Sequence, residues 1–309
     1  MKAWLSLHIY YEGSLDEILL QVLKPLIVGE QLQSYLYFYI RYWENGPHIR
    51  FRIFLEENKH FKIAKRLDEF YQSFKDEKKA NIPSNRIELV EYEQEYLRYG
   101  GHEGMRVAQL HFTSSTEVCL NILEIFPNKM NILSIAQSLM LITIMVMDNN
   151  LKRALQFFDY YSKYYHVYEK QLGSKRSDFK EYCHTSYIDN EENLNNSILK
   201  VIKMLQEGKG SKLYQEWINV HLDIFEALTN LYHTGKLLHP ITGKVPGIPD
   251  VGMQIELYSI ITQSYIHMTN NRLGINPYEE SLLAYYIARG LESFLENETG
   301  GLAENVEIN

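Results

Sequence analysis

Two arginines and a histidine alternate with apolar residues along one short stretch, His48 to Ile53 (HIRFRI). Successive side chains of a strand point to opposite faces, so His48, Arg50 and Arg52 share one face of the predicted strand. Arginines two positions apart lie roughly 6 to 7 Å from each other, which lets both bind one carboxylate or phosphate. The pattern predicts an anion-binding strand face. A solvated face of extended arginine side chains is the competing interpretation.

Other candidate groups lie beside glycines or at a helix end. Arg98 precedes Gly100 and Gly101, and His267 lies near the end of a helix predicted over Met253 to Asn270. A site built from several arginines and one histidine suits a substrate with carboxylates and a proton-transfer reaction. A structural role is the competing interpretation for His267, because a helix dipole stabilises a cation at the C-terminus of the helix.

The usual nucleophile, phosphate and metal signatures are missing from the sequence. It contains no GxSxG, P-loop or HExxH, and the run Gly100 to Gly104 (GGHEG) does not match a dinucleotide fingerprint. His102, Glu103 and His111 are better explained as polar residues of a helix than as metal ligands. We therefore expect a site that uses no metal and no cofactor.

Composition and charge narrow the class of protein. The net charge of −8 argues against direct binding of nucleic acid through bulk positive potential. Cys119 and Cys183 lie far apart without the spacing of a zinc site, which fits a reduced, cytoplasmic setting. We expect no signal peptide, and Ile132 to Met147 is shorter than the ~20 residues of a membrane span, so it reads as a buried helix.

The elements that must position these residues fall into two halves of one compact α+β domain. Residues 1–127 are expected to form a small mixed sheet with flanking helices, the strands being Trp4–Tyr11, a hairpin within Tyr35–Phe54, and Arg86–Tyr92. Their helices are predicted over Leu15–Val28, with Ser14 and Glu17 as a capping box, Lys59–Lys79 and Glu103–Phe126.

Residues 128–296 are expected to be mostly helical. Beside the helix that holds His267, the predicted helices cover Asn131–Met147, Leu151–Leu172, Leu194–Glu207, Leu213–His233 and Pro277–Glu296. The stretch from Thr234 to Gly252 reads as a loop, and a loop of this length in a compact protein tends to be functional. Residues 297–309 are expected to be a disordered tail.

Three segments of the chain together resemble the elimination domain of class I lanthipeptide dehydratases, which also occurs alone in thiopeptide and related bacteriocin pathways. The segments are FYIRYWENGPHIRFR, YEQEYLRYGG with Phe112-Thr113-Ser114-Ser115 downstream, and HMTNNRLG. They stand in the order found in that family, and the resemblance extends from Trp4 to about Phe294. Nothing resembles the large glutamylation domain, so the resemblance is to the stand-alone form.

The resemblance implies a reaction in bacteriocin biosynthesis. A separate glutamylating enzyme uses glutamyl-tRNA to esterify Ser or Thr of a precursor peptide, and the elimination domain then removes glutamate to leave dehydroalanine or dehydrobutyrine. By this resemblance the catalytic residues are Arg50, Arg52, Arg98 and His267. Arg52 and His267 are placed nearest the chemistry, and His267 is left open as base or acid. We predict four neighbours as substrate-binding: His48, Tyr99, Asn271 and Arg272.

The expected partners follow from the same resemblance. They are the glutamylated precursor peptide with its leader, the glutamylating enzyme, and a second copy of the chain, since homodimers are common among such enzymes.

Two other functions compete with elimination. Some stand-alone relatives in thiopeptide pathways look like pyridine synthases, which join two dehydroalanines in a formal [4+2] cycloaddition and expel the leader peptide. The presence of Arg50, Arg52, Arg98 and His267 favours elimination, because a cyclase has less reason to keep a carboxylate clamp. The other alternative is a non-catalytic subunit that binds an extended leader peptide along an exposed strand.

Overall fold

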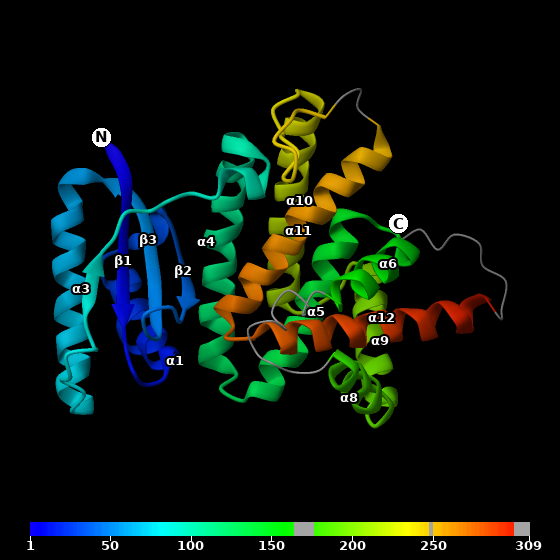
Figure 1. The fold of residues 1–309 in the computed structure, drawn as a ribbon, viewed down its shortest axis with the longest axis horizontal. Coiled ribbons are helices and arrows are strands. Elements are labelled where there is room, and N and C mark those ends of the chain that lie inside the picture. Colours follow the sequence, from blue (N-terminus) through cyan, green and yellow to red (C-terminus); the bar gives the residue numbers. More distant parts are fainter. Residues whose placement is uncertain (164–175, 247–249, 300–309) are drawn as a thin grey trace.

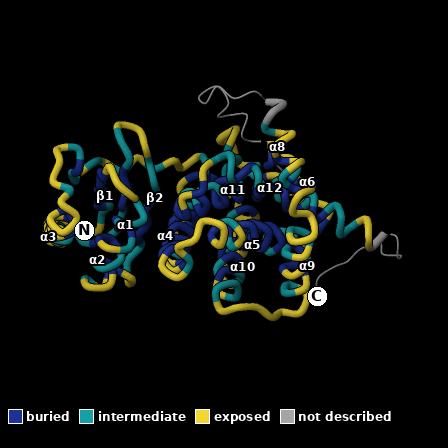
Figure 2. The backbone as a smooth tube through the Cα atoms, turned by 90° about the horizontal axis from the view of Figure 1, so that it is seen from below, coloured by how far each residue is buried: buried dark blue, intermediate teal, exposed yellow. Residues whose placement is uncertain are grey.

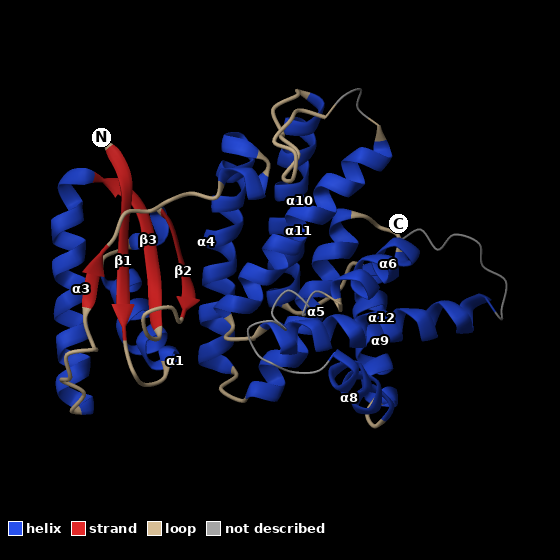
Figure 3. Cartoon of the chain, viewed as in Figure 1, coloured by secondary structure: helices blue, strands red, loops and turns tan. Residues whose placement is uncertain are grey.

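An antiparallel sheet of four strands stands at one end of the molecule in the computed structural model, which describes residues 1–163, 176–246 and 250–299 (Figures 1 and 3). The order is β2-β3-β1-β4, formed by Leu36–Tyr42, His48–Glu56, Lys2–Tyr10 and Ile87–Leu89. All three neighbouring pairs of strands are antiparallel, so the prediction of a mixed sheet is wrong. β1 and β2 run in the same direction, but β3 lies between them and pairs antiparallel with both.

The predicted alternation along β3 is confirmed. Ile49, Phe51 and Ile53 are fully buried on one face of the sheet, whereas Arg50 and Arg52 on the other face are partly exposed. The buried face packs against the helices that follow β1 and β3, including α3 (Glu57–Lys78), which runs along the side of the sheet away from α4 (Figure 1). Burial of one face leaves the cationic face turned towards the helical part.

The first helical region is less regular than predicted. It consists of α1 (Leu15–Ile18), a π-helical segment (Leu19–Leu23) and α2 (Lys24–Gly29), followed by a 3₁₀ turn at Leu32–Ser34. The predicted capping box is wrong, because the Ser14 side chain makes no cap hydrogen bond. The Glu17 carboxylate instead accepts a hydrogen bond from Lys78 Nζ on α3 at 2.7 Å, which joins the two helices.

The helical part begins after a 3₁₀ turn at Tyr96–Tyr99. Its helices are α4 (Gly101–Ile125), α5 (Lys129–Met147), α6 (Leu151–Tyr161), α8 (Arg176–Ile188), α9 (Glu191–Glu207), α10 (Lys212–His233), α11 (Val251–Arg272) and α12 (Pro277–Thr299). The confirmed fold class is therefore α+β, with a small sheet followed by a helical part.

Several boundaries differ from the predicted ones. α6 ends at Tyr161, and the remainder of the helix predicted to reach Leu172 passes into residues outside the described part. α8 was not predicted. Residues 234–246 form neither helix nor strand, as expected of the loop. Of the predicted tail, residues 297–299 belong to α12, and the rest lies outside the described residues.

One hydrophobic core crosses the boundary between residues 127 and 128. The same cluster contains Ile9 and Phe51 of the sheet, Leu123 of α4, Leu141 of α5 and Ile287 of α12, and the buried segments follow these central helices (Figure 2). This shared core makes the chain a single compact domain. Among the described residues, α5 is long and apolar enough to cross a membrane, but 61% of its apolar window is buried, as in the core helix of a soluble protein.

Strand β2 is an edge strand, and side chains of two helices satisfy its outward backbone groups. The amides of Tyr37 and Tyr39 donate to the hydroxyls of Thr113 and Thr116 on α4 at 3.2 and 3.4 Å. The side chain of Asn271 on α11 accepts from the Arg41 amide at 2.9 Å and donates to the Arg41 carbonyl at 3.0 Å. These bonds take the place of those that a further strand would make, and they hold the sheet against the helices.

Replacing Asn271 by alanine tests this attachment. Asn271→Ala leaves the Arg41 amide and carbonyl without their partners, so we expect the free energy of unfolding to fall by about 1–3 kcal/mol. Denaturant unfolding measures the change, with Asn196→Ala on the exposed surface of α9 as the matched control. Equal losses in the two variants would contradict the role assigned to Asn271.

Candidate functional site

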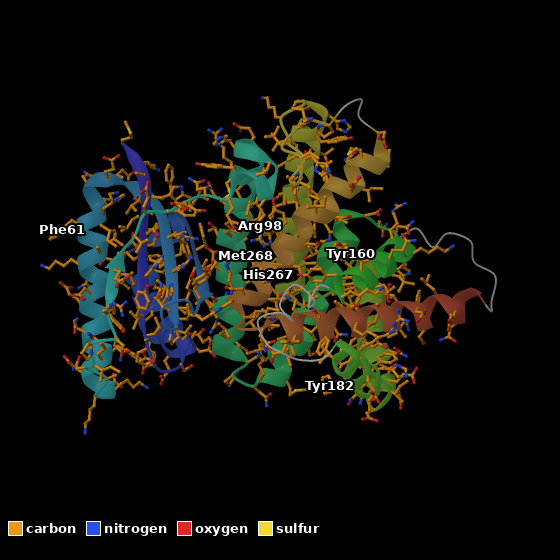
Figure 4. The ribbon with its side chains drawn as sticks, in the orientation of Figure 1. Phe61, Arg98, Tyr160, Tyr182, His267 and Met268 are labelled. Carbon is orange, nitrogen blue, oxygen red and sulfur yellow. The ribbon has the colours of Figure 1, made fainter. Side chains whose placement is uncertain are left out.

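The cationic face of β3 and the last turns of α11 line one cavity of about 680 Å³. Arg50, Arg52, Arg98 and His267, predicted from three distant segments, all line this cavity. Figure 4 shows Arg98 and His267 close together near the middle of the molecule, in the region of α4 and α11. The fold therefore brings the four predicted catalytic side chains to one place.

Arg50 and Arg52 are supported by aromatic rings. The Arg50 guanidinium lies 3.4 Å from the centroid of the Tyr42 ring, and its Nε donates to His48 Nε2 at 3.1 Å. The Arg52 guanidinium lies 4.2 Å from the centroid of Tyr92. Neither arginine forms an ion pair with a carboxylate in the part of the chain that the structure describes. Their rings and neighbours hold the two cations in place without neutralising them.

Arg272 adds a third such cation beneath the cavity. Its side chain is fully buried, where Nε donates to Thr116 Oγ1 at 3.2 Å and Nη1 donates to the Met268 carbonyl at 2.9 Å. No carboxylate pairs with Arg272 among the described residues, and burial lowers its pKa. Burial also lowers the pKa of Arg52, to about 10. This part of the cavity wall therefore carries arginines without a carboxylate partner, which favour an anionic ligand.

Two histidines beside Arg50 are kept neutral. His8 faces Arg50 across β1 and β3, and its ring stacks on that of His48 at 5.0 Å. Burial, together with the Arg50 charge, lowers the pKa of His8 to about 4, and burial lowers the pKa of His48. Because His48 Nδ1 lies 2.8 Å from the Gly46 carbonyl, the ring accepts from Arg50 through Nε2 and serves to orient that arginine.

Arg98 is positioned by the turn that precedes α4. Gly100 and Gly101 adopt φ of +87° and +91°, a backbone conformation that favours glycine. Arg98 Nε donates to Ser264 Oγ on α11 at 2.9 Å, and Nη1 lies 3.3 Å from Glu95. Tyr99, predicted as substrate-binding, is 2% exposed and stacks on Tyr265, so it forms part of the cavity wall.

His267 is held by two residues that the sequence did not point to. Its Nδ1 lies 3.3 Å from Oε1 of Glu280 on α12, and the hydroxyl of Tyr161 on α6 donates to the same oxygen. The Glu280 side chain is 6% exposed and that of His267 25%. Because this contact uses Nδ1, Nε2 is the ring nitrogen that remains to exchange a proton with a ligand in the cavity.

A short turn brings Glu280 to His267. α11 ends at Arg272, and Gly274, with φ of +71°, donates its amide to the Asn271 carbonyl at 3.0 Å. α12 then begins with Pro277, and the preceding Asn276 side chain accepts from the amides of Tyr278 and Glu279 at 3.0 Å. The helix reversal places Glu280 beside His267, although the two are thirteen positions apart in the sequence. No helical or strand period gives this spacing, so sequence reasoning missed Glu280.

The remaining predicted substrate-binding residues make mainly structural contacts. Asn271 and Arg272 line the cavity, but the Asn271 amide binds the Arg41 backbone and Arg272 is enclosed by protein. Acidic side chains that the sequence analysis did not single out, Glu91, Glu93 and Glu95, form another part of the lining. Among the described residues, no three side chains of the metal-binding types gather into a cluster.

Comparison with known proteins places this geometry in a fold with solved relatives. Residues 4–291 match a family model described as "Lantibiotic biosynthesis dehydratase C-term". The structure of TsrL matches with a TM-score of 0.71 and 19% identity over 96% of each chain. The pyridine synthase TbtD from thiomuracin biosynthesis matches with a TM-score of 0.68 and 15% identity, over 95% of this chain and 99% of that one.

A longer protein contains the same fold as one part. The tRNA-dependent lantibiotic dehydratase MibB from Microbispora sp. 107891 matches with a TM-score of 0.56 and 16% identity, over 96% of this chain and 28% of that chain. At these identities the three likenesses show the fold. A search of curated proteins finds no match to the sequence.

The neutral state of His8 predicts a pH dependence of stability. Because its pKa is about 4 in the folded protein and about 6.5 in the unfolded chain, its contribution is present above pH ~6.5 and is lost as the pH falls towards 4. Between pH 7 and pH 4.5, the free energy of unfolding should therefore fall by about 2 kcal/mol less in His8→Gln than in the wild type. Denaturant unfolding at both pH values measures this difference, and equal falls in variant and wild type would refute the explanation.

Proposed function

We propose that this chain, which belongs to the lantibiotic biosynthesis dehydratase C-terminal family, is an eliminase. It removes glutamate from O-glutamyl Ser or Thr of a precursor peptide and leaves dehydroalanine or dehydrobutyrine. One observation carries the proposal. Arg50, Arg52 and the buried Arg272 surround a cavity shared with His267, and none of the three pairs with a carboxylate among the described residues.

The charges of the cavity suit a glutamyl ester. An aminoacyl group delivered by tRNA is esterified through its α-carboxyl, so the bound glutamyl group keeps a free side-chain carboxylate and an ammonium. Arg50 and Arg52 supply paired donors for the carboxylate. Glu91, Glu93 and Glu95 on another part of the wall supply acceptors for the ammonium. A dehydroalanine substrate, by contrast, offers no anion to these arginines.

The reaction needs a base at Cα and positive charge beside the groups that become negative. His267 Nε2 takes the Cα proton, the electron pair of that C–H bond forms the Cα–Cβ double bond, and the Cβ–O bond breaks to release the glutamate α-carboxylate. Negative charge on the adjacent amide oxygen and on the leaving carboxylate is stabilised by Arg52 and Arg98. Glu280 fixes the His267 ring and balances the imidazolium that forms.

The partners follow from this reaction. A separate glutamylating enzyme must supply the ester. Because aminoacyl-tRNA is a cytoplasmic substrate, we place the protein in the cytoplasm.

The direct test is turnover of a synthetic peptide that carries one O-glutamyl serine. Incubation with the protein should release free glutamate and lower the peptide mass by one glutamic acid, giving dehydroalanine. Absence of release from such peptides, with and without their leader, would overturn the proposal.

A pyridine synthase is the second candidate, favoured by the match to TbtD over 99% of that chain. It predicts that a peptide already carrying two dehydroalanines is cyclised and loses its leader, while glutamylated peptides are left unchanged. A non-catalytic peptide-binding subunit predicts neither reaction, so the two substrates separate all three functions.

Replacing Arg52 should separate activity from stability. We expect Arg52→Ala to slow glutamate release by about 100-fold or more, because the transition state loses a preorganised cation. Its melting temperature should stay equal or rise, since the change removes a buried charge without a carboxylate partner. Peptide assays and thermal melts measure both effects. Arg106→Ala, an exposed arginine on α4, is the control that should retain the wild-type rate; a matching loss there would contradict the assignment.

Replacing Glu280 tests the orientation of His267. Glu280→Gln keeps the shape but removes the carboxylate beside Nδ1, so kcat for glutamate release should fall by about 10- to 100-fold while KM changes little. Steady-state kinetics with the glutamylated peptide measure this split. The neighbouring Glu279, which pairs with Lys129 at 2.9 Å, provides the control Glu279→Gln with unchanged kcat. A raised KM with normal kcat in Glu280→Gln would show that Glu280 acts in binding instead.

A further inference from the structure

A second cavity, of about 460 Å³, lies on the other side of Arg98 and His267, which line both cavities. Unlike the first, it contains no carboxylate in its described lining and only one arginine, Arg98. Its other walls come from the 3₁₀ turn, the loop after α10, and helices α6 and α11. They combine the apolar side chains of Leu97, Pro240, Ile241 and Ile260 with the polar ones of Tyr161, Gln263 and Ser264. The two cavities therefore differ in their charged groups but meet at the proposed base.

The loop that forms one wall of this second cavity is anchored. Leu237 is fully buried beside Gly100, and the Leu238 amide donates to the Gly100 carbonyl at 2.9 Å. His239 Nδ1 accepts from the Ile241 amide at 3.1 Å, and the Gly243 amide donates to the His239 carbonyl at 2.8 Å. These bonds determine where Ile241 lies relative to the cavity.

The anchored loop holds an isoleucine out in solvent. Ile241 is 73% exposed, and Leu97 on the facing turn is 43% exposed, although both line the same cavity. Apolar side chains gathered and held at the rim of a cavity mark a site where an apolar ligand group is to be covered. A single isoleucine on a loose surface would carry no such meaning.

The continuity of a peptide identifies the occupant. If the glutamylated residue has its Cα proton at His267 and its glutamyl group among the arginines, the next residue begins about 3.8 Å away. The glutamyl group then occupies the first cavity, whereas the second cavity opens from the same His267 and has no carboxylate in its described lining. One flanking side chain of the substrate would therefore enter it.

We propose that Leu97, Pro240 and Ile241 form a subsite for an apolar side chain of the residue next in sequence to the glutamylated Ser or Thr. This inference rests on the proposed elimination function and adds a selectivity for substrate sequence. It also assigns a role to the long loop after α10.

Introducing a carboxylate into the subsite and a matching lysine into the peptide tests the proposal. Two pairs of O-glutamyl serine peptides carry Leu or Lys on one or the other side of the modified residue, and initial rates of glutamate release are compared. The wild type should prefer Leu over Lys by about tenfold on one side. Ile241→Glu should reverse this preference, because a carboxylate then faces the peptide lysine. Ile125→Glu, at a similarly exposed position on α4, should keep the wild-type preference.

A cross-linking experiment reads the same contact without turnover. Both native cysteines are buried, so Ile241→Cys adds one accessible thiol. It should form a disulfide faster with a peptide whose cysteine lies next to the modified serine than with one whose cysteine lies five residues away.

The outcomes are distinct. Glutamate release with the same Leu preference in wild type and Ile241→Glu, and no positional effect on cross-linking, would overturn the subsite but leave the eliminase proposal standing. No release from any peptide would overturn both. Reversal of the preference in Ile241→Glu alone supports the subsite.

Discussion

The attachment of edge strand β2 to helices α4 and α11 is the constraint on which the site depends. Three successive outward amides of β2 donate to Thr113, Thr116 and Asn271 instead of to another strand. An open edge would leave these amides to water or to another chain. Because the partners stand on two helices, the bonds also fix the distance between the cationic face of the sheet and the end of α11, where His267 lies.

The same region tolerates charges that a purely structural core would avoid. Arg272 is fully buried and Arg52 largely enclosed, yet neither has a carboxylate partner among the described residues. Aromatic rings, a hydroxyl and a backbone carbonyl supply weaker compensation. Such charges are costly to folding. Their retention around one cavity is what an enzyme for an anionic substrate would require, and neutral His8 and His48 keep the positive charge from increasing further.

The residues that we propose for proton transfer and for charge binding come from different parts of the fold. The sheet contributes Arg50 and Arg52, whereas three helices contribute His267, Glu280 and Tyr161. Arg98, on the turn that joins the two parts, touches Ser264 and lines both cavities. In the mechanism we propose, a peptide substrate is bound by one layer and deprotonated from the other.

The sequence alone determined most of the elements and which residue types share a face or a turn, because both follow from local rules. The alternation of HIRFRI fixed which side chains share a face, and the glycines after Arg98 indicated a sharp turn. Three separated motifs gave the family and the four residues that line one cavity. Tertiary structure decided the rest. Whether β3 lay between β1 and β2, whether Asn271 bound backbone or ligand, and whether Glu280 reached His267 depend on contacts between segments with no common period. Such contacts are set by how helices and sheet pack together, and no local pattern encodes that packing.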